Sequence, residues 1–275
     1  MCYLALLLSV CSNSAFAQSV STLIGARAAG IGYSSSCLKD EWSVFNNVAG
    51  LANVNNTVAS ASYDARPLLP GSNRMALVFA TPLRLGTLGF GALKFGDDLY
   101  SEQIICAGFG NAFGTTSLGA KLNYVQYNAT GFGTKGIISI SAGGITELIP
   151  NLFLGAHIIN INQPVISRES KERLPTTLIA GLGYLHAKKV YLSTEIEKDL
   201  DHDLLWKAGI EYTPLAKVAF RAGFNINPNA TFFGTGFRSR KITLDYTLHY
   251  SVALSMNHQL SIGYQFPNKH AKVTD

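Results

Sequence analysis

Asp201, His202 and Asp203 stand next to one another and form the most reactive short motif of the sequence. Carboxylates and histidine are common general acids and bases, but a hydrolytic site also needs a nucleophile or activated water and a group that orients the base. No such set accompanies this motif. We therefore interpret it as a solvated polar loop and predict no enzymatic activity, with a hydrolytic site as the alternative.

Three other kinds of site find little support in the sequence. Gly89-Phe90-Gly91 with Gly96 resembles a nucleotide loop, but the glycines lie in a strand-like segment and no helix follows. The six histidines are scattered without metal-ligand spacing, which predicts no metal and no cofactor. The net charge of +5 is not gathered into a basic run, so no nucleic-acid partner is predicted.

Charged residues of both signs recur on one face of several strand-like segments. Glu195 faces Lys207 if the chain turns near Asp201, and Glu211 approaches Arg221 if it turns again near Leu215. Opposite charges across two strands contribute roughly 0.2–1 kcal/mol each. The predicted set of inward ion pairs is Glu195, Lys207, Glu211, Arg221, Arg238 and Asp245.

These charges require strands to position them, and from Val54 onward the chain repeats segments of about ten residues with period-two alternation. The predicted strands are 54–65, 73–82, 85–95, 101–111, 115–128, 135–148, 151–161, 174–186, 189–199, 203–213, 217–227, 230–239, 241–250 and 257–267. An even number of such segments, fourteen here, is typical of a transmembrane antiparallel β-barrel. The predicted fold is therefore all-β, with the barrel over residues 54–267.

Composition supports this fold class. Hydrophobic residues make up 47% of the chain and charged residues only 14%. No apolar run reaches the roughly eighteen residues of a spanning helix. Alternation as in Ile242, Leu244 and Tyr246 against Thr243 and Asp245 gives each strand one apolar and one polar face. A soluble β-sandwich or propeller has the same period and remains the alternative.

The first residues are typical of a signal peptide over 1–17. Leu4 to Val10 form a short apolar core, and Ala15-Phe16-Ala17 matches the cleavage pattern, so the mature chain is expected to begin at Gln18. A lipoprotein signal that uses Cys11 is the alternative. Of the cysteines that remain, Cys37 and Cys106 are predicted to be buried thiols, although an exported protein can also pair them.

Residues 18–53 differ from the repeat and are predicted to plug the barrel. The stretch 25–32 is rich in small residues, and Leu38 to Leu51 has helix-like spacing with Asp40 and Glu41 early in it. The alternative is a mobile periplasmic arm. Residues 268–275 are expected to form a C-terminal tail.

The same N-terminal residues resemble the opening motif of the PorV/PorQ branch of the FadL-like outer-membrane proteins of Bacteroidota. The resemblance rests on Gly25, Arg27, Gly30 and Gly32, on the run 40–51, and on Leu174-Pro175-Thr176-Thr177. Val48 stands where that group usually has proline. The plug motif that the resemblance implies consists of Arg27, Trp42, Phe45, Asn47, Gly50 and Leu51. The resemblance also implies a plugged fourteen-stranded barrel in the outer membrane of a Gram-negative bacterium.

The connections between the strands indicate where partners bind. The long connection from Gln163 to Arg173 is predicted to face outward and engage other proteins, because long loops on rigid scaffolds often carry recognition. Its charged residues are Arg168, Glu169, Lys171, Glu172 and Arg173. Short turns at the opposite end carry basic residues that can bind lipid phosphates or an acidic periplasmic partner. These residues are Arg84, Lys188, Lys189, Lys217, Arg240 and Lys241.

Two functions follow as expectations. Some PorV/PorQ-like relatives are accessory barrels of the type IX secretion machinery, which implies a non-enzymatic subunit of a larger secretion or assembly complex. It would contact outer-membrane lipid and other outer-membrane or periplasmic proteins. FadL itself moves hydrophobic ligands, which makes a channel for small hydrophobic molecules the alternative. The compact outer loops differ from those of FadL and favour the first expectation.

Overall fold

Fourteen antiparallel strands close into one barrel, in which each strand pairs with its neighbours in the sequence and β1 pairs with β14. The strands are β1 (Val58–Ala65), β2 (Arg74–Leu83), β3 (Gly86–Gly96), β4 (Tyr100–Phe113), β5 (Thr116–Ala129), β6 (Gly133–Ile149), β7 (Leu152–Ile159), β8 (Thr177–His186), β9 (Val190–Lys198), β10 (Leu205–Leu215), β11 (Val218–Ile226), β12 (Ala230–Arg238), β13 (Ile242–Ser251) and β14 (Ser255–Gln265). The predicted fold class and strand number are thereby confirmed.

This computed structural model describes residues 21–131, 133–166, 173–199, 203–251 and 255–267. Several predicted features lie outside the described residues. They are the signal peptide (1–17), the C-terminal tail (268–275), Asp201, His202, Arg168, Glu169, Lys171 and Glu172.

The two faces of the strands differ as the alternation predicts. Outward side chains such as Leu77 and Ile105 are 62% and 63% exposed, whereas the adjacent inward Val78 and Ile104 are 4% and 2% exposed. A surface that exposes large apolar side chains around a closed barrel suits lipid, and the closed sheet leaves no backbone edge unpaired.

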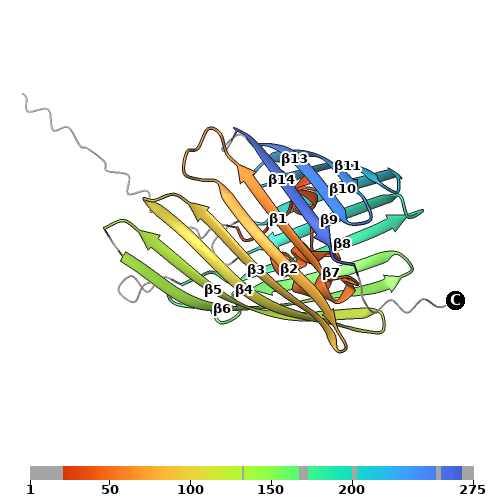
Figure 1. The fold of residues 1–275 in the computed structure, drawn as a ribbon, viewed down its shortest axis with the longest axis horizontal. Coiled ribbons are helices and arrows are strands. Elements are labelled where there is room, and N and C mark those ends of the chain that lie inside the picture. Colours follow the sequence, from red (N-terminus) through yellow and green to blue (C-terminus); the bar gives the residue numbers. More distant parts are fainter. Residues whose placement is uncertain (1–20, 132, 167–172, 200–202, 252–254, 268–275) are drawn as a thin grey trace, which may run out of the picture.

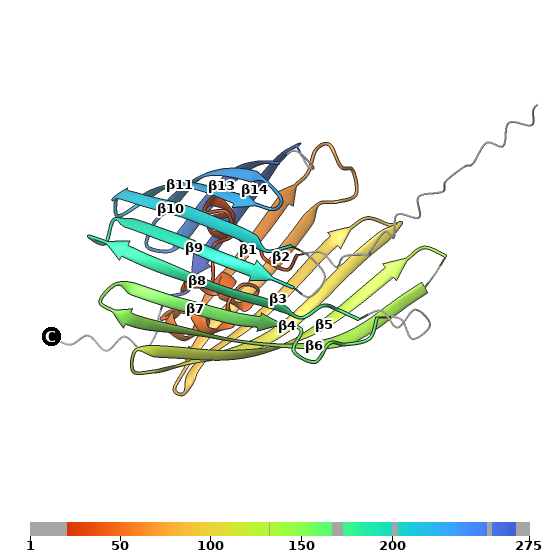
Figure 2. The same cartoon turned by 180° about the vertical axis from the view of Figure 1, so that it is seen from behind.

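The N-terminal segment lies inside the barrel, as both views show (Figures 1 and 2). It contains α1 (Ala26–Gly30) and two 3₁₀ helices, η1 (Glu41–Val44) and η2 (Val48–Asn53). The expectation of one helical run from Leu38 to Leu51 is thus corrected to two short turns. Asn47 interrupts the run, because its side chain accepts from Ala49 N and begins η2 as its N-cap. Val54 N still donates to Leu51 O, so β1 begins at Val58 and not at Val54.

The two ends of the barrel have different connections. One end carries the short turns that follow β2, β4, β6, β8, β10 and β12, and we call it the turn end. The other end, which we call the loop end, carries the longer connections, including that between β7 and β8. Arg74 at the loop end donates to the carbonyls of Ser21 and Leu23, so the described chain starts at the loop end. It then runs through the lumen and reaches the first residue of β1 at the turn end. Within the described residues, no helix is long and apolar enough to cross a membrane.

Candidate functional site: the plugged lumen

Glycines on the inner wall allow the plug, residues 24–53, to approach the strands closely. A Cβ on Gly223 would collide with the backbone of Ile31 and Gly32, and one on Gly209 would collide with Ile31. On the opposite wall, a Cβ on Gly119 would lie 2.8 Å from the backbone of Val48 and Ala49. These contacts need backbone against backbone, which only glycine permits.

We expect Gly223→Val to destabilise the barrel by about 1–3 kcal/mol, the usual cost of inserting atoms into a packed interior. The neighbouring Ala222→Val is the matched control, because Ala222 points outward and does not touch the plug. Urea unfolding of the detergent-solubilised protein measures both. Equal unfolding midpoints for the two variants would show that the plug does not rest on this glycine.

A network of five charges, buried on the wall and partly exposed in the plug, ties the plug to β10, β11 and β13. Arg27 of α1 donates to both carboxylate oxygens of Glu211, at 3.0 and 2.8 Å, and to Asp40 at 3.2 Å. Arg221 donates to Glu211 at 2.5 Å and to Asp245 at 2.7 Å. Glu211 therefore bridges a wall arginine and a plug arginine. Sequence reasoning placed Glu211 near Arg221 but missed the bond from Arg27, because that contact joins residues far apart in the chain.

A second ionic group lies on β9 and β10. Lys207 and Glu195 face each other across the strand pair, with Nζ 2.9 Å from Glu195 and 2.6 Å from Glu197. The second oxygen of Glu195 accepts from the plug backbone at Ser36 N, at 2.7 Å. Glu195 thus joins the wall to the plug while its charge is balanced by Lys207.

Two further wall contacts hold the 3₁₀ helices. Lys121 Nζ donates to the carbonyls of Val44 and Phe45, both at 3.0 Å, at the C-terminal end of η1. A cation there satisfies carbonyls that have no partner within the helix. Asn47 of the plug motif donates to Ser36 O at 2.7 Å and to Gly144 O on the wall at 3.1 Å.

Gly50 and Leu51, the last residues of the plug motif, fill tight positions. A Cβ on Gly50 would collide with Leu38 O and Ser43 Oγ, so the folded-back plug needs glycine there. Leu51 is fully buried and reaches toward Gly89. Gly89 and Gly91, two of the glycines weighed as a nucleotide loop, therefore provide space for plug side chains.

A polar cluster that the sequence did not indicate lies at the loop end. Arg74 donates to Asp64 at 2.8 Å and to Tyr33 Oη at 3.0 Å, and Tyr33 in turn donates to Gln259 at 2.8 Å. Arg74 and Asp64 were assigned to a strand without a role. Only the closure of β1 on β14 brings Gln259 beside them.

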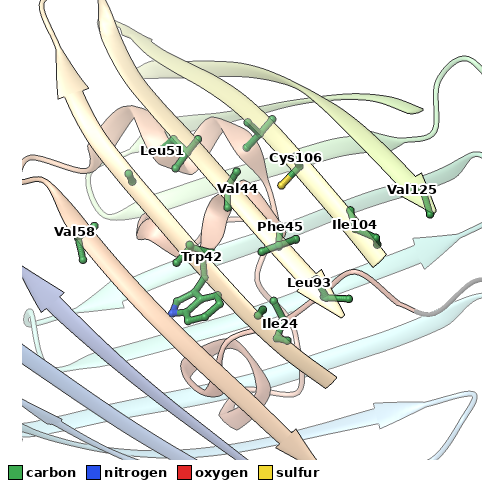
Figure 3. Packing of buried hydrophobic residues seen from close by; sticks show 14 of the residues in the cluster. Ile24, Trp42, Val44, Phe45, Leu51, Val58, Leu93, Ile104, Cys106 and Val125 are labelled. Atoms are coloured by element: carbon green, nitrogen blue, oxygen red, sulfur yellow. The ribbon is translucent and has the colours of Figure 1, made fainter. Parts of the chain in front are cut away.

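The other half of the lumen is apolar (Figure 3). Trp42 and Phe45 of the plug motif pack against inward residues of β2 to β6, such as Leu93, Ile104 and Val125, in one continuous cluster. At the loop end the cluster includes Leu174 and the partly buried Ile166. We call this cluster the apolar strip. It connects the loop end of the lumen to the plug.

A polar cavity of about 210 Å³ opens between the plug and the wall at the turn end, with Lys39, Asp40, Glu41 and Arg238 among its lining residues. Burial raises the pKa of Glu41, and the adjacent Asp40 carboxylate raises it further. Arg238 is exposed at this opening, and the described residues show no ion pair for it. The prediction that placed Arg238 among the lumen ion pairs is corrected, because the side chain lies at the end of β12, in reach of water.

The predicted partner loop turns back toward the lumen where its structure is described. Arg173 is exposed and forms an isolated bridge with Val165, but the next residue, Leu174, is only 3% exposed within the apolar strip. Leu174 N donates to Pro164 O at 3.0 Å, which fixes this return. The two ends of the loop therefore cover the mouth of the lumen.

The described residues contain no group of three or more His, Cys, Asp and Glu side chains placed to hold a metal ion. Cys37 and Cys106 are free and buried, in the plug and on β4 respectively. Asp203 is exposed before β10. The arrangement of the described lumen is suited to holding a plug.

No protein-family model and no curated protein sequence matches the chain. Solved structures do share its fold. A channel for monoaromatic hydrocarbons, CymD, has a TM-score of 0.67 at 14% identity, over 91% of this chain and 99% of that one. The Pseudomonas putida toluene transporter TodX has 0.67 at 12%, over 90% and 100%. A Pseudomonas aeruginosa FadL homologue has 0.63 at 11%, over 90% and 100%. These similarities show a FadL-like fourteen-stranded barrel fold, and they do not distinguish the PorV/PorQ branch within it.

Proposed function

We propose that this protein is an outer-membrane channel for small hydrophobic molecules, closed by its N-terminal plug. The observation that carries the proposal is the apolar strip, which runs from Leu174 at the loop end to Phe45 in the plug. A pore for water-soluble molecules would have polar groups along its path. An apolar wall instead lets a hydrophobic molecule leave water without losing hydrogen bonds. The hydrophobic ligands in the names of CymD and TodX are consistent with this proposal.

The orientation follows from the connections. Outer-membrane barrels have short periplasmic turns and longer outer loops, so the turn end faces the periplasm and the loop end faces the outside. A hydrophobic molecule then meets Leu174 and Ile166 first and reaches Phe45 and Leu51 of the plug next. Passage beyond that point requires the plug to shift, since its side chains close the strip.

We expect cells that produce the protein to take up radiolabelled toluene faster than cells with an empty vector. Leu174→Glu is expected to lower the protein-dependent rate about tenfold, because a carboxylate at the apolar mouth adds at least about 1.4 kcal/mol to the barrier. Arg173→Glu is the matched control, since the adjacent Arg173 is exposed outside the strip. Uptake by folded wild-type protein that does not exceed the vector background would refute the proposal.

The second candidate is an accessory subunit of a secretion or assembly complex of the type IX kind. It is favoured by the one-sided distribution of basic residues, since Lys188, Lys189, Lys217, Arg240 and Lys241 are exposed on three consecutive turns between β8 and β13. An acidic periplasmic surface complements such a patch. Purification in mild detergent distinguishes the two: a stoichiometric large partner that is lost when Lys188, Lys189 and Lys217 become Glu supports the second candidate.

A further inference from the structure

Strand β6 is longer than its neighbour β7, with 17 residues against 8, and continues past it at the loop end (Figure 2). On one side, β6 pairs with β5 as far as Gly133. On the other side, its ladder with β7 reaches only to Ala142, opposite Ile158. Where the two strands overlap, the closed sheet leaves no edge unpaired. Beyond that overlap, β6 presents one edge of its backbone.

The side chain of Asn162 occupies the first part of this edge. Its Oδ1 accepts from Ile140 N at 3.0 Å, and its Nδ2 donates to Ile138 O at 2.9 Å. A side-chain amide carries the same kinds of donor and acceptor as a peptide group. Asn162 therefore contacts β6 as the backbone of an added strand would, which indicates that this edge is placed to bind peptide groups.

The next two residues of the edge are Gly136 and Thr134, because alternate residues of a strand direct their backbone N–H and C=O to the same side. Among the described residues, no backbone or side-chain group forms a hydrogen bond with these N–H and C=O groups on the β7 side. Both residues are exposed, so an incoming chain can reach them. A free edge of this kind pairs readily with another extended chain.

We propose that this edge, residues 133–138 of β6, binds an extended segment of another protein, which adds to the sheet as a further strand. Main-chain hydrogen bonds provide the affinity in this mode of recognition, and alternating side chains provide the specificity. In the orientation proposed above, the loop end faces the outside, so the partner approaches from the cell surface. The inference does not depend on transport.

The side chains beside the edge indicate the chemistry of the segment that it binds. Lys135 is the only charged residue between 133 and 138, is exposed, and shares the inward face of β6 with Ile137. The outward face presents Ile138, which is 60% exposed. Opposite charges and apolar side chains stabilise neighbouring strands when they face each other. A segment that alternates acidic and apolar residues therefore complements both faces of the edge.

Fluorescence polarisation of a labelled, end-blocked peptide in which valine and glutamate alternate, with the protein in lipid nanodiscs, tests the proposal. Two further peptides carry N-methyl groups, one on every valine and the other on every glutamate. Alternate amides of a strand point to opposite edges, so one methylated peptide should bind like the parent and the other should not. Absence of binding by the parent peptide, or equal binding of the two methylated peptides, would overturn the proposal.

Variants of the edge test the same contact from the side of the protein. Gly136→Pro removes an N–H that faces the edge and none that pairs with β5, so the barrel should fold and bind the parent peptide about tenfold more weakly. Gly136→Ala is the matched control, because it adds a Cβ against the ring end of Tyr124 but keeps the N–H, and its affinity should be unchanged. Lys135→Gln should weaken binding up to about fivefold.

Equal peptide affinity of folded Gly136→Pro and Gly136→Ala would show that the peptide does not pair with this edge and would overturn the proposal. The methylated peptides test the same contact on the wild-type protein even where Gly136→Pro fails to fold. A protein that binds the parent peptide without taking up toluene would refute only the proposed channel.

Discussion

Replacing Arg221 by methionine is expected to destabilise the barrel by about 3–5 kcal/mol, the usual effect of removing one partner of a buried ion pair. The wild-type network holds two cations, Arg27 and Arg221, and three carboxylates, Asp40, Glu211 and Asp245. Without Arg221, three carboxylates share Arg27. Among the described residues, Asp245 then has no cation within ion-pair distance, although its side chain is only 9% exposed.

The free energy of unfolding in urea, measured for the protein in detergent, is the readout for this variant. Arg240→Met is the matched control, because Arg240 is exposed in the turn between β12 and β13 and should change stability by less than about 0.5 kcal/mol. The double variant Arg221→Met with Asp245→Asn should recover part of the loss, since it removes one unpaired charge. A cost below about 1 kcal/mol for Arg221→Met alone would mean that water enters the network and screens it.

Local periodicity is enough to predict the wall of this barrel. Alternation such as Val218, Phe220 and Ala222 against Arg221 and Gly223 sets which side chains face inward, because strand residues alternate with a period of two. A tight turn then fixes the register of the hairpin, so that Lys207 lies opposite Glu195. Both inferences use residues that are close in the chain.

The plug was harder to predict, because its structure depends on contacts with distant strands. Helix-like spacing over 38–51 suggested one helix, but the wall glycines, Lys121 and Asn47 favour two short 3₁₀ turns. The bond from Arg27 to Glu211 spans 184 residues, and no local pattern indicates it. Tyr33, Arg74 and Gln259 meet for the same reason, only after the barrel has closed.

The recognition loop that was predicted to end at Arg173 stays a prediction, since residues 167–172 lie outside the described residues. Near its two ends, Ile166 and Leu174 pack against the apolar strip, which no local charge pattern indicates. Arg238 was expected to form an ion pair in the lumen: its inward register is correct, but at the end of a strand the inward side opens to water. Position along the strand therefore matters as much as the face on which a residue lies.

Removing the plug is expected to have the largest effect on permeability. The segment 24–53 contacts β1 to β6 through its 3₁₀ helices and β11 to β14 through α1, so it spans the lumen. A variant that lacks residues 21–53 should either form an open pore or fail to fold. Gly223→Val keeps the full chain and only loosens the plug, so brief openings are expected from it even where the deletion variant cannot be refolded.

Conductance of the intact protein in planar lipid bilayers tests the plugged lumen most directly. The ion pairs of Arg27 and the apolar packing of Phe45 hold the plug against both sides of the lumen. We therefore predict that intact barrels insert without stable, large conductance, and that the deletion variant conducts under the same conditions. Stable, large conductance from the intact protein would contradict the plug and, with it, the proposed gated channel.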